Sequence, residues 1–430
     1  MTTLMLVILG VWFASLFAGV PIWLAMALAG FAFLQFAGIP DLAVAQRLAK
    51  SVDSFPLLAA PLFILMGNVM NSSNITTRIF DFAKVCVGWM RGGLCHANIV
   101  ASVFFAGTSG SAVADAGGLG TLEIKAMTDE GYSPDIAAAL TASSATIGPI
   151  IPPSLPMIIY GVSAEASVGA LFIAGVIPGL LMAGALMLMV RAIAVRLDLP
   201  RHPFPTVGDV WRAFKGAFWA LMTPAILFAG LFGGVFTPTE AAAVAVAYAL
   251  VLGLVIYRDL SLAALPKIIL ETVETTGVVL ALVMAASLLS YCLALSQVPQ
   301  IAGAWLASLS ANPLVYLLIV NAVLLVVGCF MEAIAAMLIL VPILVPPALA
   351  LGIDPIQFGL VFVLNLMIGT ITPPVGVVLY VTARVANISF ERVTRATLPF
   401  LVPLLAVLLA ITLWPPLTTW LPGLVLGGQR

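Results

Sequence analysis

Long apolar runs dominate this chain, and most of them are about as long as a membrane is thick. An α-helix of about 20 apolar residues crosses the hydrocarbon core of a bilayer. Only 8% of the 430 residues are charged and 63% are hydrophobic, whereas soluble proteins carry roughly a quarter charged residues. We therefore predict an all-α polytopic membrane protein, embedded in the lipid bilayer. Its apolar runs lie at about 4–18, 20–36, 54–71, 135–160, 168–190, 217–234, 238–257, 271–292, 355–381 and 396–425.

Two further segments, 96–127 and 320–350, do not have the pattern of simple spans. Each is apolar at its ends, while its middle is small, polar or interrupted. Irregular backbone is tolerated at membrane depth only where protein covers it, as in a re-entrant hairpin of two half-helices. We therefore predict two hairpins, with tips near Gly107–Ser111 and Gly328–Glu332.

The basic residues predict the orientation of the chain in the membrane. If the N-terminus is periplasmic and each hairpin enters and leaves on one side, 14 of the 17 Lys and Arg residues are cytoplasmic. The opposite orientation would reverse this ratio, and cytoplasmic loops are the ones that carry excess Lys and Arg. The segment 191–216 is then a basic cytoplasmic linker. The start of the chain, MTTLMLVILG, has no positive region and no cleavage signal, so we interpret it as the first span.

The glycines and prolines of the two halves coincide when the chain is shifted by 221 positions. Each half contains five spans and one hairpin, and because five is odd the second half runs in the inverted direction, as is common in secondary transporters. We predict inverted repeats at 1–190 and 217–430, with broken helices at 135–160 and 355–381. The coinciding pairs are Gly107 and Gly328, Gly131 and Gly352, Pro134 and Pro355, Gly148 and Gly369, Pro152 and Pro373, and Pro153 and Pro374.

The broken helices are predicted from two related sequences, GPIIPP at 148–153 and GTITPP at 369–374. Proline has no N–H and clashes with the preceding turn, so carbonyl groups upstream lose their usual donors. Unwound carbonyls and half-helix ends coordinate sodium in secondary transporters. We predict that each hairpin tip meets a break near the membrane midplane. The helix-breaking residues are Pro152, Pro153, Pro373 and Pro374.

Polar side chains near the tips and breaks are the candidate ion ligands. In the first half they are Thr108, Ser109 and Ser111 at the tip, with Thr141, Ser143, Ser144 and Thr146 before the break. The alternative is that these small residues only permit close helix packing. In the second half they are Asn365, Thr370 and Thr372, together with Glu332 beside Gly328. An ionisable residue at membrane depth indicates function by default, but Glu332 could also be a protonated structural acid.

The remaining polar candidates are open between two roles. Asp115 is either a structural cap or a functional acid, and Glu123 is expected near the cytoplasmic face. Arg384 is either a cytoplasmic anchor or, with Ser154, part of the substrate site. No nucleophile elbow, zinc-protease or Walker motif occurs, so we predict a protein that is not an enzyme and needs no cofactor. No basic stripe suggests nucleic acid.

Several stretches resemble the large membrane subunit of tripartite ATP-independent periplasmic (TRAP) transporters. The resemblance rests on GTSGSAVADAGGLGTLEIKAM, EGYSPDIAAALTASSATIGPIIPPSLPMIIYG and NLMIGTITPPVGVVLYV, supported by FTPTEAAA and GCFMEAIAAMLILVPILVP, and it covers nearly the whole chain. It implies a small membrane subunit and a periplasmic substrate-binding protein as partners. It also implies sodium-coupled uptake of a small organic anion, such as a C4-dicarboxylate or sialic acid, across the bacterial inner membrane.

The resemblance further implies an elevator transporter, with scaffold helices in 4–71 and 217–292, and two bound sodium ions. Glu332 departs from the family, which usually has Asp there, and this adds a methylene at the second tip. The candidate ligands are Thr108, Ser109, Ser111, Ser144 and Gly148 for sodium site one, and Gly328, Glu332, Asn365, Gly369 and Thr372 for site two.

Two other functions remain open at this point. One is an anion symporter or antiporter of related architecture that needs no binding protein. The other is a membrane enzyme or an assembly scaffold, which would require polar catalytic groups at one depth. Because no ATP site is found, transport energy must come from an ion gradient or from another subunit.

Overall fold

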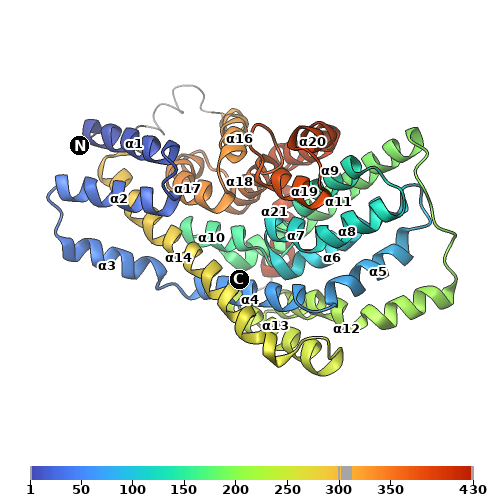
Figure 1. The fold of residues 1–430 in the computed structure, drawn as a ribbon. Coiled ribbons are helices and arrows are strands. Elements are labelled where there is room, and N and C mark those ends of the chain that lie inside the picture. Colours follow the sequence, from blue (N-terminus) through green and yellow to red (C-terminus); the bar gives the residue numbers. More distant parts are fainter. Residues whose placement is uncertain (1, 299–300, 302–311, 428–430) are drawn as a thin grey trace.

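A computed structural model describes residues 2–298, 301 and 312–427, and every regular element in this part of the chain is helical (Figure 1). The elements of the first half are α1 (Thr2–Phe17), α2 (Ile22–Phe36), α3 (Asp41–Val52), η1 (Phe55–Leu58), α4 (Ala59–Asn71), α5 (Ile75–Val87), α6 (Gly93–Ser109), α7 (Ala112–Gly117), α8 (Leu119–Asp129), α9 (Pro134–Ala145), α10 (Leu155–Ser163) and α11 (Val168–Arg196). Those of the second half are α12 (Val207–Phe232), α13 (Pro238–Val251), η2 (Leu252–Ile256), η3 (Leu262–Ala264), α14 (Leu265–Leu295), α16 (Pro313–Phe330), α17 (Ala333–Ala350), α18 (Pro355–Gly369), α19 (Val377–Ala386), α20 (Phe390–Leu413) and α21 (Pro416–Leu426).

Seven of the described helices are long and apolar enough to cross a membrane, or eight if the bent pair formed by 41–52 and 55–71 is one span. Shorter apolar helices account for the first limb of the first predicted hairpin and for the second broken helix. Both limbs of the second predicted hairpin, 313–330 and 333–350, are instead among the seven helices of spanning length. The chain is therefore a multi-pass membrane protein, as its apolar runs indicate.

Local sequence explains where the helices around the breaks begin. Pro134 and Pro355 each occupy the first turn of a helix, where a missing N–H costs nothing. Ser133 and Asp354 cap these helices through hydrogen bonds to the first-turn N–H groups. Thr237 forms a capping box with Glu240 at the start of α13.

The hairpins and breaks lie close to their predicted places. The first tip is at Gly110 and Ser111, between α6 and α7, and the second is at Met331 and Glu332, between α16 and α17. The first break separates α9 from α10, and the second separates α18 from α19. The first limb of the second hairpin starts at Pro313, seven residues before the predicted boundary, because Asn312 caps the helix there.

Two segments differ from the prediction. Most of the predicted linker 191–216 is helical, because α11 continues to Arg196 and the capping box of Thr206 and Asp209 starts α12 at Val207. Only 197–206 connects the two helices without regular structure. The helix α3 was not predicted, because charged and polar residues interrupt its apolar positions and leave no continuous apolar run.

The helices pack so that the two halves of the chain interlock. The long helix α14 runs diagonally across the molecule and packs on α2, α3, α4 and α17 (Figure 1). The hairpin helices α6 and α8 pack on α9, while α16 and α17 pack on α18. Across the halves, α7 packs on α19 and α17 packs on α10. Each hairpin therefore contacts its own broken helix and the second segment of the other one.

Candidate functional site

The first break is a compact loop that satisfies part of its own backbone. Pro149, Pro152 and Pro153 provide no N–H donors between α9 and α10. Ser154 donates its hydroxyl to the carbonyl oxygen of Pro149 and accepts from the N–H of Met157, so it caps α10. Its side chain is fully buried in this role. The assignment of Ser154 to the substrate stays a prediction, and the structure gives it a capping function.

The first hairpin tip lies directly on this break. Gly110 adopts the left-handed conformation, and a Cβ there would lie 3.0 Å from the nitrogen of Leu155 and 3.2 Å from the oxygen of Pro153. A Cβ on Gly148 would collide with the carboxylate of Asp115, which is buried. The tip therefore meets the end of the break through backbone at Gly110, and the side chain of Asp115 lies against the break at Gly148. The side chains of Thr108 and Ser109 lie outside the described residues.

The second hairpin tip contacts its break just as closely. A Cβ on Gly369 would lie 2.6 Å from the Cα and carbonyl carbon of Gly328, so the two backbones pack face to face. The N–H of Gly376 also donates to the carbonyl oxygen of Cys329, at 3.2 Å. The predicted site-two glycines are thus brought together by backbone contact.

A buried polar network joins the first hairpin to α9. Asn98 on α6 donates to Glu123 Oε2 at 2.7 Å and to Thr141 Oγ1 at 2.8 Å. Ser144 donates its hydroxyl to Asn98 Oδ1 at 2.6 Å. All four residues are at most 1% exposed. One amide therefore links both limbs of the hairpin to the helix that leads into the break.

The second half contains a similar connection. Asn365 on α18 donates to Asn321 Oδ1 at 2.8 Å, and Asn321 on α16 donates to Thr412 Oγ1 at 3.0 Å. Asn365 precedes Gly369 by four positions, as Ser144 precedes Gly148. The Oδ1 atom of Asn365 is buried and has no hydrogen-bond partner among the described residues. This oxygen is available to a ligand beside the second break.

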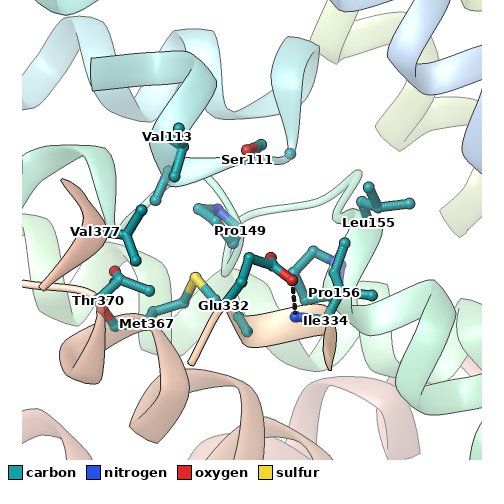
Figure 2. Close-up of a pocket in the computed structure, with 13 residues that line it drawn as sticks. Ser111, Val113, Pro149, Leu155, Pro156, Glu332, Ile334, Met367, Thr370 and Val377 are labelled. Carbon is teal, nitrogen blue, oxygen red and sulfur yellow. Dashed lines mark hydrogen bonds between the residues drawn. The ribbon is translucent and has the colours of Figure 1, made fainter. Parts of the chain in front are cut away.

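Both tips and both breaks line one small chamber (Figure 2). Its volume is about 40 Å³, and the two tips contribute Ser111 and Glu332. Pro149 comes from the first break and Thr370 from the second. Glu332 Oε2 accepts hydrogen bonds from the N–H groups of Ile334 and Ala335, at 2.9 and 3.1 Å, and so caps α17.

A larger cavity of about 620 Å³ adjoins the chamber and shares Ser111 and Glu332 with it. Its other wall is formed by α2, α4 and α14, with Asn68, Asn71 and Thr275 as polar lining residues. The rest of its lining is largely apolar, and neither Lys nor Arg is among its lining residues. A solute there would contact hydroxyl and amide groups, one carboxyl and apolar surface.

The structure does not assign a role to three other predicted residues, Arg384, Thr372 and Thr146. Arg384 is exposed in the last turn of α19 and is not among the residues that line the chamber or the cavity. The Thr372 hydroxyl donates to the carbonyl of Ile368, and Thr146 donates to Ser143. Their assignment as ligands or as packing residues stays open.

Sequence reasoning missed Asn98, Asn321 and the burial of Glu123. Glu123 is 1% exposed, because the chain turns at Gly118 between α7 and α8 and directs this side chain toward α6. Its expected place near the cytoplasmic face stays a prediction. A lone Asn in each apolar limb was the available signal, since polar side chains in membrane helices usually find interhelical partners.

Comparison with known proteins assigns the chain to a family. Residues 9–417 match the family described as the tripartite ATP-independent periplasmic transporter, DctM component. The chain belongs to this DctM family. The resemblance to TRAP transporters is thereby confirmed, and the chain is a transporter component rather than an enzyme.

Relatives of this DctM-family chain are found in several bacteria. It is 48% identical over 97% of its length to the sialic acid TRAP transporter large permease protein SiaM of Vibrio cholerae, and covers 98% of that protein. It is 40% identical over 88% of its length to the C4-dicarboxylate permease DctM of Pseudomonas aeruginosa, covering 89% of it. In fold it is similar to the YdaH transporter of Alcanivorax borkumensis, with a TM-score of 0.67, 19% identity and coverage of 87% and 88% of the two chains.

Proposed function

We propose that the chain is the sodium-coupled transport subunit of a TRAP transporter, which carries a small organic acid across the inner membrane. The observation that supports this best is the meeting of two hairpin tips and two broken helices at one chamber. Half-helix ends and unwound backbone at membrane depth are typical of ion and substrate sites in secondary transporters.

Two sodium ions would bind where each tip meets its break. Site one uses Thr108, Ser109, Ser111, Ser144 and Gly148. Site two uses Gly328, Glu332, Asn365, Gly369 and Thr372. The unpartnered Oδ1 of Asn365 supports site two, because sodium requires oxygen ligands and this buried oxygen has none of its usual donors. The hydroxyl of Ser144 already donates to Asn98, which leaves its oxygen lone pairs for a cation.

The substrate would bind in the cavity of about 620 Å³, between the tips and α14. Because neither Lys nor Arg lines this cavity, the carboxylate of an organic acid would be balanced by the sodium ions, and its polar groups by Asn68, Asn71 and Thr275. Binding energy for the substrate then depends on sodium, which is the basis of the coupling. The sialic acid and C4-dicarboxylate permeases among the relatives support this substrate class.

The proposed transporter includes a small membrane subunit and a periplasmic binding protein that delivers the substrate. Within the chain, the hairpins and broken helices would move as an elevator against a scaffold of α2, α4, α13 and α14. The inverted repeat relates the two halves of the moving part. A transporter of the same architecture that needs no binding protein is the second candidate, and it is favoured if the chain alone suffices for uptake.

Uptake into proteoliposomes tests the proposal. The purified chain is reconstituted with its small subunit, and the binding protein is loaded with sialic acid. We expect uptake only with an inward sodium gradient and with both partners present. Uptake without sodium would refute the coupling, while uptake by the chain alone would refute the three-part scheme and favour the second candidate.

A further inference from the structure

A separate cavity of about 330 Å³ lies between α3, α10, α14 and α17. By the predicted topology it is on the periplasmic side. It is distinct from the cavity of about 620 Å³ described above, which we call the central cavity. Along α14, Thr275 to Leu282 line the central cavity, whereas Val283 to Ser290 line this one. Leu282 and Val283, which are consecutive on α14, therefore line different spaces. We call this cavity of about 330 Å³ the outer cavity.

The outer cavity is lined by hydrogen-bond donors that the protein does not use. Within the described part of the chain, the hydroxyl groups of Ser54, Ser163, Ser287 and Ser290 make no hydrogen bond, and Lys50 makes no ion pair. These serines come from three separate segments, which are the loop before η1, the end of α10 and the middle of α14. All four hydroxyl groups are therefore free to bind a solute in the cavity.

The charge of the outer cavity is also one-sided. Lys50 is a cation among its lining residues, and neither Asp nor Glu lines it. Arg47, one turn earlier on α3, is held over the ring of Tyr291 with its guanidinium carbon 4.6 Å from the ring centroid. An ammonium with several hydroxyl groups matches a carboxylate on a hydroxylated solute, because charge-assisted hydrogen bonds to carboxylate are the strong ones.

We propose that the outer cavity is a binding site for a small hydroxylated carboxylic acid, with Lys50 holding the carboxylate and Ser54, Ser163, Ser287 and Ser290 binding hydroxyl groups. The site rests on the proposed function, because its ligand is the incoming substrate. Its volume is within the range of small-molecule sites. The cavity lies between α3 and α14 on one side and α10 and α17 on the other, so an occupant contacts both the proposed scaffold and the proposed moving part. Substrate bound there would contact Val283, whose neighbour on α14, Leu282, lines the central cavity.

Transport kinetics of the complete reconstituted transporter give the first test. For Lys50→Gln, we expect the sialic acid concentration for half-maximal uptake to rise about tenfold, the effect of one lost charge-assisted interaction, with the maximal rate within twofold. Lys50→Arg should restore most of the affinity. Arg47→Gln is the matched control, since it removes the same charge from the same helix but not from the cavity lining, and it should change neither value more than twofold. An unchanged half-maximal concentration in Lys50→Gln would overturn the proposal while leaving the proposed function intact.

Chemical protection tests the site without transport. Ser290→Cys is introduced into a Cys86→Ser background, and the chain in nanodiscs is treated with a hydrophilic maleimide in sodium-free buffer. We expect sialic acid to slow labelling at least fivefold, and to lose this effect when Lys50→Gln is added. Equal protection by inorganic phosphate would overturn the assignment to a carboxylic acid, and no protection by sialic acid or by succinate would overturn the site. Protection in a chain that shows no sodium-driven uptake would retain the site and reject the proposed function.

Discussion

At the scale of single residues, the second hairpin tip and its break meet through contacts that leave no room for a side chain. Gly328 and Gly369 touch through their backbones, and a Cβ on Gly369 would lie 2.6 Å from Gly328. Backbone atoms cannot move away as the end of a flexible side chain can, so a methyl group must separate the hairpin from the broken helix. Overpacking of this kind typically costs about 1–3 kcal/mol.

We therefore predict that Gly369→Ala lowers the thermal unfolding midpoint and abolishes sodium-dependent uptake. Gly184→Ala is the control, because a Cβ on Gly184 meets nothing within 4 Å, and it should behave as the wild type. Unfolding is followed by tryptophan fluorescence in detergent, and uptake in proteoliposomes. Normal sodium dependence in Gly369→Ala would show that the contact is not needed for coupling.

The second prediction at this scale concerns the stability of Asn98 variants, because three polar partners bond to the amide of this residue. Removal of the amide leaves Glu123, Thr141 and Ser144 without their hydrogen bonds to Asn98. Each buried polar group left unsatisfied lowers the stability of a protein by about 1–3 kcal/mol. Asn98→Asp should destabilise at least as much as Asn98→Ala, since it places a carboxyl group against Glu123.

A double-mutant cycle checks this explanation. If the carboxyl group introduced by Asn98→Asp repels Glu123, adding Glu123→Gln should recover part of the lost unfolding midpoint, and should not do so in Asn98→Ala. Equal effects of Glu123→Gln in both backgrounds would mean that Asn98 and Glu123 are not coupled.

At the scale of elements, the sequence predicted the breaks and tips well and the polar network poorly. Glycine and proline act on the backbone where they stand, so their positions predicted 148–153 and 369–374 directly. The partners of Asn98 are 25 to 46 residues away, and no local pattern indicates which polar groups packing will bring together. The helix α3 escaped prediction for a related reason, because its apolar residues occupy one face rather than a run.

The prolines of the first break give an element-scale prediction. Pro152→Ala with Pro153→Ala should restore N–H donors at the break and favour continuous helix, so sodium-dependent uptake should fall at least tenfold, with a smaller effect on the unfolding midpoint. Pro346→Ala with Pro347→Ala is the matched control, because that pair lies inside the unbroken helix α17. Normal sodium dependence in the first double variant would contradict a role of the break in coupling.

At the scale of the whole molecule, the positions of the two cavities along α14 predict from which side of the membrane the central cavity can be reached. The central cavity is lined by Thr275 to Leu282 of α14, which lie closer to the predicted cytoplasmic end of this helix than the residues that line the outer cavity. We predict that Thr275→Cys, in a Cys86→Ser background, reacts with a membrane-impermeant maleimide in inverted vesicles but at least tenfold more slowly in right-side-out vesicles. Faster labelling in right-side-out vesicles would mean that either the predicted topology or the predicted open side of the cavity is wrong.

The packing of α7 on α19 and of α17 on α10 also has a consequence for how the protein is made. The tip helix α7 has no cover from α19 until some 265 further residues have been synthesised. At about 5–20 residues per second, this takes roughly 15–50 s. During that interval the first tip, with buried Asp115, enters the membrane without its final neighbour. Ribosome-bound chains that end before α19 should therefore depend on an insertion factor or chaperone that shields this hairpin, and release from that factor would mark the moment when the two halves join.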